Sequence, residues 1–248
     1  MRSNISGRDT TTFTKIHRPT NREVFEILRR HGKLPPMAGG SPGWPIQDNF
    51  NRANQVGLGA MSDGVHNWTD AQGQIDIVTN QAKTTGPDGG NVAVVTETHT
   101  ETDYYVQAEV TSASSSDPGV FGRYTDLNNY YLLRIDNATL QLYKNVAGSF
   151  TLLGSYSTTA GTHTIKLEMN GTTLKGYLDG VEQIPSVTDT AHASGKSGIR
   201  SYYGTSPVWD NFIADLLAAA AGQPIRKRMG GIPGMRNDVP GFGSTGRW

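Results

Sequence analysis

The sequence has no cysteine among its 248 residues. This absence excludes disulfide bonds, thiolate metal sites and cysteine nucleophiles together. The chain also has no apolar run of the length that a transmembrane helix needs, so it predicts no membrane partner. Residues 1–15 lack the apolar centre of a secretory signal, and we therefore expect no export by that route.

Motifs for metal and nucleotide chemistry are missing as well. The histidines never occur in the H-x-H or HExxH spacing that presents two nitrogens to one metal ion. No P-loop and no dinucleotide-binding glycine pattern occurs, and the Gly-Gly pairs are typical of turns. We therefore predict no cofactor and no metal centre built from these motifs.

The net charge of zero conceals an uneven distribution of charge along the chain. Residues 1–45 have eight Lys or Arg against three Asp or Glu, and residues 214–248 have five against two. Residues 46–213 have nine against seventeen. The pattern indicates an acidic globular part between two basic ends. Such ends either bind an acidic partner or only keep the protein soluble.

The clearest structural signal is the stretch Gly119–Asn145. It predicts three short strands joined by tight turns at residues 128–129 and 136–137, because Asn and Asp tolerate the left-handed backbone of such turns. Side chains alternate between two faces: Tyr131, Leu133 and Ile135 against Leu132, Arg134 and Asp136, then Leu140, Leu142 and Val146 against Gln141 and Tyr143.

Segments with the same alternation continue through residues 46–214. They are separated by Gly, Asn, Asp and Ser, and the dipeptides at 170–171 and 179–180 are typical of hairpin turns. Roughly fourteen strands without helical crossovers predict one all-β antiparallel sandwich and argue against a parallel α/β fold.

Four motifs in this region resemble concanavalin A-like, or laminin-G-like, jelly-roll domains. They are DNFNR (48–52), HTIKLEMNGTTLKGYLDGVEQI (163–184), GKSGIRSYYG (195–204) and VWDNF (208–212). The resemblance implies a jelly roll over about residues 46–214, with the first strand beside the last. That family includes sugar-binding modules, glycoside hydrolases and adhesion domains, so the fold does not fix the function.

Residues 1–45 predict an extended arm that contains one short helix. Thr20 and Glu23 fit a capping box, and the helix is expected over about residues 20–31. The Pro/Gly-rich segment 34–45 then reads as a linker.

Residues 215–248 predict a basic, Gly/Pro-rich tail without a core of its own. Its RKRMGG and GRW elements resemble the termini of tailed-phage virion proteins. Direct nucleic-acid binding is not expected, because only three cations are consecutive and no aromatic residue interrupts them. The candidate partner-anchoring residues of arm and tail are Phe13, Ile16, Phe25, Leu28, Arg29, Arg30, Arg226, Lys227, Arg228, Met229, Phe242, Arg247 and Trp248.

Exposed aromatic rings are candidates for sugar binding, because the apolar face of a sugar ring packs against them. In the pairs Tyr104-Tyr105, Tyr130-Tyr131 and Tyr202-Tyr203, alternation sends one ring inward and one outward. The alternative is that the outward ring only covers the sheet. The candidate carbohydrate-binding residues are Trp68, Tyr124, Tyr130, Tyr202 and Trp209.

Catalytic and calcium-binding residues are harder to find. Related glucanases carry an E-x-D-x-x-E strand, whereas here Asp76 stands without either glutamate. Asp126 and other strand acids could pair, but acids on solvent-facing strands are common. The family resemblance allows a structural Ca²⁺ on the oxygens of residues 126–129 or 87–90, and both segments also fit plain turns.

Together these features favour a non-enzymatic structural protein of a phage virion, a decoration or cement protein of the capsid. Its arm and tail would bind the major capsid protein or another virion protein and sibling subunits of a homo-oligomer, while the sandwich faces outward. We expect synthesis in the host cytoplasm and location in the virion. One alternative is a carbohydrate-binding module or tail-fibre adhesin, and another is a divergent glycoside hydrolase.

Overall fold

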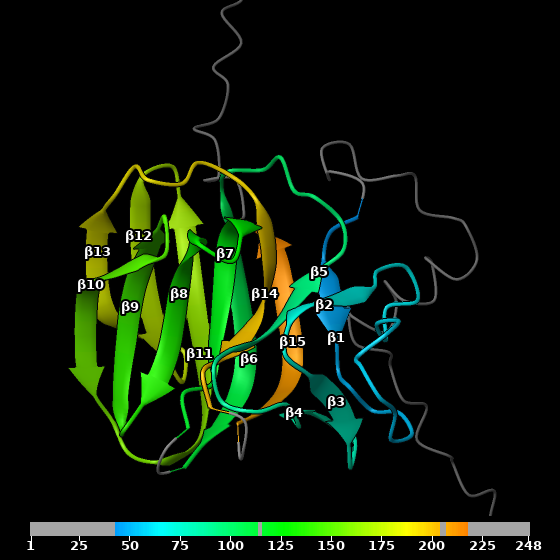
Figure 1. The fold of residues 1–248 in the computed structure, drawn as a ribbon. Helices are drawn as coiled ribbons and strands as arrows, with labels where there is room; N and C mark the ends of the chain where they lie inside the picture. The colour runs from blue at the N-terminus through cyan, green and yellow to red at the C-terminus, as the bar shows by residue number, and fades with distance from the viewer. Residues whose placement is uncertain (1–42, 114–115, 204–206, 218–248) are drawn as a thin grey trace, which may run out of the picture. The chain divides into compact units, whose positions relative to one another are not determined.

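The structure, a computed structural model, describes residues 43–113, 116–203 and 207–217. Within these residues the chain forms fifteen β-strands in two antiparallel sheets that face each other (Figure 1). The predicted all-β antiparallel sandwich is confirmed. The helix expected over residues 20–31 lies outside the described residues, as does the tail beyond residue 217.

The first sheet has eight strands. They are β1 (Ile46–Asp48), β3 (Ile75–Val78), β4 (Gln81–Thr84), β6 (Tyr104–Ser112), β11 (Gly161–Asn170), β12 (Thr173–Leu178), β13 (Val181–Thr188) and β15 (Val208–Leu216). Their order is β13-β12-β11-β6-β15-β4-β3, and β1 pairs with β15, where Asp48 lies opposite Phe212. The first strand therefore lies beside the last, as the family resemblance implied.

The second sheet has seven strands. They are β2 (Trp68–Gln72), β5 (Asn91–Val95), β7 (Gly119–Asp126), β8 (Asn129–Asp136), β9 (Thr139–Val146), β10 (Ser149–Ser157) and β14 (Lys196–Ser201). Their order is β10-β9-β8-β7-β14-β5-β2. Consecutive hairpins place β7, β8, β9 and β10 side by side (Figure 1).

The three strands predicted within Gly119–Asn145 are β7, β8 and β9. Their turns fall one residue away from the predicted dipeptides, and Asn137 and Ala138 of the second turn have φ values of 46° and 56°. Strand β4 has no strand signal in the sequence, because QAKT offers one small apolar residue and too short an alternation. Val146, predicted to share the face of Leu140 and Leu142, is 40% exposed.

The core lies between the two sheets and follows the predicted alternation. Leu133, Ile135 and Leu142 of the seven-stranded sheet belong to the same buried cluster as Val106 and Ile165 of the eight-stranded sheet. Each such side chain contributes on the order of 2 kcal/mol by leaving water. Burial at every second residue is therefore the main reason that these segments pair face to face.

Trp209 and Trp68 are part of this core. Trp209 is fully buried on β15 and its indole Nε1 donates a hydrogen bond of 3.1 Å to the carbonyl of Gly119, at the start of β7 in the opposite sheet. Trp68 packs edge-on against Phe212 and donates through Nε1 to buried Asp48 at 2.8 Å. Both indole rings therefore stabilise the sandwich from its core, and neither ring presents an exposed face to solvent.

Arg123 is buried although it belongs to strand β7. Its φ of 51° breaks the alternation, and its guanidinium donates to the carbonyls of Thr102, Gly171 and His192. These carbonyls belong to connecting segments rather than to strands. Arg123 therefore links three loops that are distant in sequence through hydrogen bonds to their backbones.

A second apolar cluster covers the outer face of the seven-stranded sheet. It comprises Val92, Val94, Phe121, Tyr124, Tyr130 and Leu132, with Ala71 and Tyr143 packed against it. We call it the outer cluster. Leu132 and Phe121 are fully buried there, although simple alternation would leave them facing solvent.

The structure has no helix, among the residues that it describes, that is long and apolar enough to cross a membrane.

Candidate functional site

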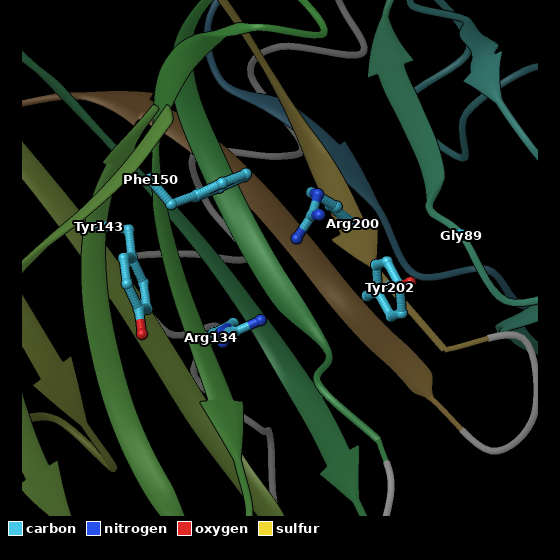
Figure 2. Close-up of a pocket in the computed structure, with 6 residues that line it drawn as sticks. All are labelled: Gly89, Arg134, Tyr143, Phe150, Arg200 and Tyr202. Atoms are coloured by element: carbon cyan, nitrogen blue, oxygen red, sulfur yellow. The ribbon is translucent and has the colours of Figure 1, made fainter. Parts of the chain in front are cut away.

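A hollow of about 390 Å³ lies on the outer face of the seven-stranded sheet, beside the outer cluster. Its lining comes from β8, β9, β10, β14 and the segments that follow β4 and β14 (Figure 2). The lining residues are Gly89, Arg134, Tyr143, Phe150, Arg200 and Tyr202. We call it the arginine–aromatic hollow.

Strand register explains why these side chains meet. Gly119 of β7 lies between Arg200 of β14 and Arg134 of β8 in one cross-strand row. The inner face carries Ile199 and Leu133, so the two arginines project outward. Gly119 places no side chain between the arginines, and the space is closely packed, because a Cβ there would come within 2.9 Å of the Arg134 Cβ.

Aromatic rings flank the hollow on both sides. Figure 2 shows Tyr143 and Phe150 on one side and Tyr202 on the other, with the arginines between them. Phe150 is 44% exposed and Tyr202 is 48% exposed. Phe150 stands nearly perpendicular to Tyr143, with ring centroids 6.1 Å apart. The arrangement offers apolar ring faces next to charged hydrogen-bond donors.

Asp117 organises the floor of the hollow and has a fully buried side chain. It accepts hydrogen bonds from Arg134 Nη1 at 2.8 Å, from Ser201 Oγ at 2.7 Å and from the backbone N–H of Tyr202 at 2.7 Å. Since the same carboxylate holds both Arg134 and the Tyr202 backbone, it fixes the arginine side of the hollow to the aromatic side.

The two arginines differ in how they are held. Arg134 also contacts Asp136 Oδ2 at 3.1 Å and donates through Nε to Gln141 Oε1 at 3.1 Å. For Arg200, the nearest carboxylate oxygen among the described residues is Asp117 Oδ2 at 4.0 Å, which is too long for a hydrogen bond. Its guanidinium lies over the Phe150 ring, 5.2 Å from the centroid. Arg200 therefore faces the hollow with donors that these acceptors do not use.

The segments considered for calcium form hydrogen-bonded turns. Gly89 and Gly90 donate their N–H groups to the carbonyl of Tyr202 at 3.0 and 3.2 Å, so the turn at 87–90 supports the wall of the hollow. Asp126 accepts from the Asn128 backbone and the Asn129 side chain. Within the described ranges, no group of three His, Asp or Glu side chains is placed to hold a metal ion.

The predicted carbohydrate-binding residues fall into three places. Tyr202 lines the hollow. Tyr124 and Tyr130 lie on the same outer face but are packed into the outer cluster, where they are 9% and 2% exposed. Trp68 and Trp209 were expected to be exposed platforms, and the structure corrects this, because both are buried in the core between the sheets.

Sequence reasoning missed most of the lining. Tyr143, Phe150, Arg134 and Arg200 were not selected, although alternation around Leu133 and Leu142 already placed Arg134 and Tyr143 on the outer face. Their meeting with Arg200 depends on β14 pairing with β7, a contact between segments far apart in sequence.

The predicted orientation of the tyrosine pairs is confirmed where burial decides it. Tyr104 and Tyr131 lie in the core between the sheets, while Tyr130 lies on the outer face. The Tyr104 hydroxyl donates to the carbonyl of Gly195 at 2.9 Å and accepts from the N–H of Arg123 at 2.6 Å. Burial raises the pKa of Tyr104 well above its ordinary value.

The carboxylate Asp76, considered for catalysis, is committed to local structure. It accepts hydrogen bonds from Thr85 Oγ1 at 2.6 Å, the Gly57 N–H at 2.7 Å and Gln74 Nε2 at 2.7 Å. Burial alone would raise its pKa, but these three donors outweigh burial and the pKa of Asp76 lies below the ordinary value. A carboxylate stabilised in its ionised form is poorly suited to donate a proton to a leaving group.

The predicted partner-anchoring residues of the arm and tail all lie outside the described residues, since the first lies at Phe13 and the last at Trp248. Their role therefore remains a prediction.

The sequence matches no protein-family model and no curated protein sequence. Solved structures do match the fold. A carbohydrate-binding module CBM66 from Bacillus subtilis is 18% identical with a TM-score of 0.51, and the match covers 60% of this chain and 94% of that one. The carbohydrate recognition domain of Emp46p is 8% identical with a TM-score of 0.51, and the match covers 71% of this chain and 97% of that one.

A GH43 protein, BlXynB from Bacillus licheniformis, is 18% identical with a TM-score of 0.50. The match covers 74% of this chain but only 41% of that protein. At these identities the similarity establishes the fold alone. The described residues therefore have the lectin-type, concanavalin A-like jelly roll that the four sequence motifs implied.

Proposed function

We propose that this protein binds carbohydrate, and that the arginine–aromatic hollow is its glycan site. The observation that carries the proposal is the placement of exposed Phe150 and Tyr202 on opposite sides of a hollow whose floor holds two outward arginines. The jelly-roll fold shared with a carbohydrate-binding module supports it by analogy.

The chemistry of the lining suits a sugar. A sugar ring has an apolar face, which packs against an aromatic ring, and a rim of hydroxyl groups, which accept hydrogen bonds from guanidinium N–H groups. A volume of about 390 Å³ lies within the range of small-molecule sites. The site is largely preformed, because Asp117 fixes Arg134 and the Tyr202 backbone in the free protein.

The proposed module is non-catalytic. Glycoside hydrolysis uses two carboxylates on either side of the sugar bond. None of the six residues that line the hollow is Asp or Glu, and Asp117 beneath it is fully buried and occupied by its donors.

The experiment is a glycan array probed with the full-length protein, followed by titration calorimetry on each hit. We expect saturable binding that weakens by about five- to thirtyfold in Phe150→Ala and in Tyr202→Ala, since each loses roughly 1–2 kcal/mol of ring contact. Tyr156→Ala is the matched control, because Tyr156 is also on β10 and is 40% exposed but does not line the hollow.

Two results would contradict the proposal. One is an array without hits across neutral and acidic glycans, in a preparation whose near-ultraviolet circular dichroism shows native packing. The other is binding that Tyr156→Ala weakens as much as Phe150→Ala does, which would place the site elsewhere on the sheet.

We further propose that the basic arm and tail attach this glycan-binding sandwich to a phage virion, on the capsid or on a tail fibre. The support is in the sequence: both ends carry a basic excess and apolar residues, and the tail resembles the termini of virion proteins. The expected partners are a major capsid or other virion protein and further copies of this chain.

A further inference from the structure

We propose that the arginine–aromatic hollow selects acidic glycans, with the carboxylate of a uronic acid paired to Arg200. This inference rests on the proposed function, since it names the class of sugar that the same site binds. Its evidence is the unequal engagement of the two arginines and their position across a glycine.

Arg134 is committed to the protein. Its guanidinium contacts Asp117 Oδ2 at 2.8 Å, Asp136 Oδ2 at 3.1 Å and Gln141 Oε1 at 3.1 Å. These contacts use donors on three different nitrogens. Arg134 therefore holds the floor, with its charge balanced by Asp117 and Asp136 and three of its five N–H groups engaged.

Arg200 is the arginine that a ligand can engage. Its nearest carboxylate oxygen in the described residues, Asp117 Oδ2, lies at 4.0 Å and is already the acceptor of Arg134. Packing over Phe150 at 5.2 Å holds the Arg200 guanidinium in place without using its N–H groups. The side chain is thus positioned in advance but not neutralised by an ion pair at hydrogen-bond distance.

A carboxylate fits this arrangement better than a hydroxyl does. The planar guanidinium presents parallel N–H donors that match the two oxygens of a carboxylate, and such charge-assisted pairs are about twice as strong as neutral hydrogen bonds. Phe150 and Tyr202 beside it provide apolar faces for the sugar ring that carries the carboxylate. A uronic acid unites both groups in one residue of a polysaccharide.

The charge of the rest of the sandwich makes the local arginines decisive. Residues 46–213 have nine basic against seventeen acidic side chains, so the sandwich as a whole repels a polyanion. An acidic glycan would therefore bind only where a local cation outweighs this repulsion. Arg200 is the cation available for this, because Arg134, its neighbour across Gly119, is paired with Asp117 and Asp136.

The experiment compares matched acidic and neutral oligosaccharides by titration calorimetry with the full-length protein. The probes are oligogalacturonate against galactan oligosaccharides and oligomannuronate against mannan oligosaccharides, each at about 0.1 and 0.5 M salt. We expect at least tenfold tighter binding of one acidic probe than of its neutral counterpart, and a weaker preference at high salt.

Variants assign the preference to Arg200. Arg200→Gln should remove the preference for the acidic probe, while Arg200→Lys should retain part of it, because lysine keeps the charge but not the planar fork. Lys175→Gln is the matched control, because it changes the charge equally on β12 of the other sheet. Thermal melts of each variant show whether the fold is intact.

The outcomes separate this inference from the proposed function. Neutral probes that bind as tightly as acidic ones, with binding lost in Phe150→Ala but unchanged in Arg200→Gln, would overturn the inference and leave the proposed function standing. An acidic preference that Lys175→Gln reduces as much as Arg200→Gln would also overturn it. Absence of binding to all four probes and to the glycan array would overturn both.

Discussion

At the scale of single residues, His99 is enclosed by aromatic rings. Its ring centroid lies 4.6 Å from that of Trp44 and 6.1 Å from that of Tyr104, and the residue is 5% exposed. Burial lowers the pKa of His99 to about 4. The folded protein therefore keeps this imidazole neutral at pH values where the unfolded chain protonates it.

This gives the stability a pH dependence of defined sign. Above about pH 7.5 both states are neutral at His99, and the site adds no pH dependence. As pH falls from about 6.5 to 4, the unfolded state binds a proton that the folded state excludes, so the free energy of unfolding decreases. A difference of this size corresponds to about 3 kcal/mol in total.

We expect His99→Phe to flatten the decrease between pH 6.5 and 4, because phenylalanine keeps the aromatic packing and cannot titrate. Urea unfolding at pH 7, 5.5 and 4.5 measures the difference. Part of the decrease should remain in the variant, because burial also lowers the pKa of His192 and this residue is unchanged. An unchanged slope in His99→Phe would show that the acid sensitivity arises elsewhere.

At the scale of elements, strand β14 joins the two halves of the seven-stranded sheet. Gly198 lies opposite Val94 of β5 on one side and Phe121 of β7 on the other. A Cβ at this position would come within 2.3 Å of both the Ala93 carbonyl oxygen and the Phe121 Cζ. Backbone on one side leaves no room for the side chain, so only glycine allows both pairings.

We therefore expect Gly198→Ala to lower the free energy of unfolding by about 2 kcal/mol through overpacking. Gly180→Ala is the comparison: its φ of 81° is unfavourable for alanine, but no atom lies within 4 Å of the added Cβ, so about 1 kcal/mol is expected. Chemical denaturation of the two variants measures the difference. A smaller loss in Gly198→Ala than in Gly180→Ala would contradict this account.

The hollow also shows which features of a strand the sequence predicts: its position and the direction of its side chains, but not its neighbouring strands. Alternation in Gly119–Asn145 gives β7, β8 and β9 and the outward direction of Arg134 and Tyr143. Alternation does not predict the second neighbour of β7, on the side away from β8, which is β14 from a distant part of the chain. For this reason Arg134 was predictable as an outward residue but not as one of a pair with Arg200.

At the scale of the whole molecule, the distribution of charge bears on attachment. If the basic ends anchor the acidic sandwich to a virion, full-length protein should co-sediment with bare shells of the parent phage. Replacing Arg226, Lys227 and Arg228 together by alanine should weaken this binding by about tenfold, because three exposed ion pairs contribute roughly 0.5 kcal/mol each.

Phe150→Ala is the control for that experiment, since it alters the proposed glycan site and leaves both ends unchanged. It should sediment with the shells as the parent protein does. Equal binding by the parent protein and by a chain lacking residues 218–248 would overturn the anchoring role of the tail.

The sequence by itself determined the class of fold and its central hairpins. Two-residue alternation and turn residues are local properties, and they act the same way whatever the rest of the chain does. The motifs that resemble jelly-roll domains added the pairing of the first strand with the last, which β1 and β15 confirm.

Only the tertiary structure decided which aromatic and charged residues meet at a surface. Trp68 and Trp209 look like sugar platforms in sequence, but both face inward on strands whose partners close over them. Phe150 and Arg200 carry no such signal in sequence, yet strand order brings the Arg200 guanidinium to 5.2 Å from the centre of the Phe150 ring on the outer face. The physical reason is that alternation assigns each side chain to one of two faces, whereas the order of strands from distant parts of the chain determines what covers that face.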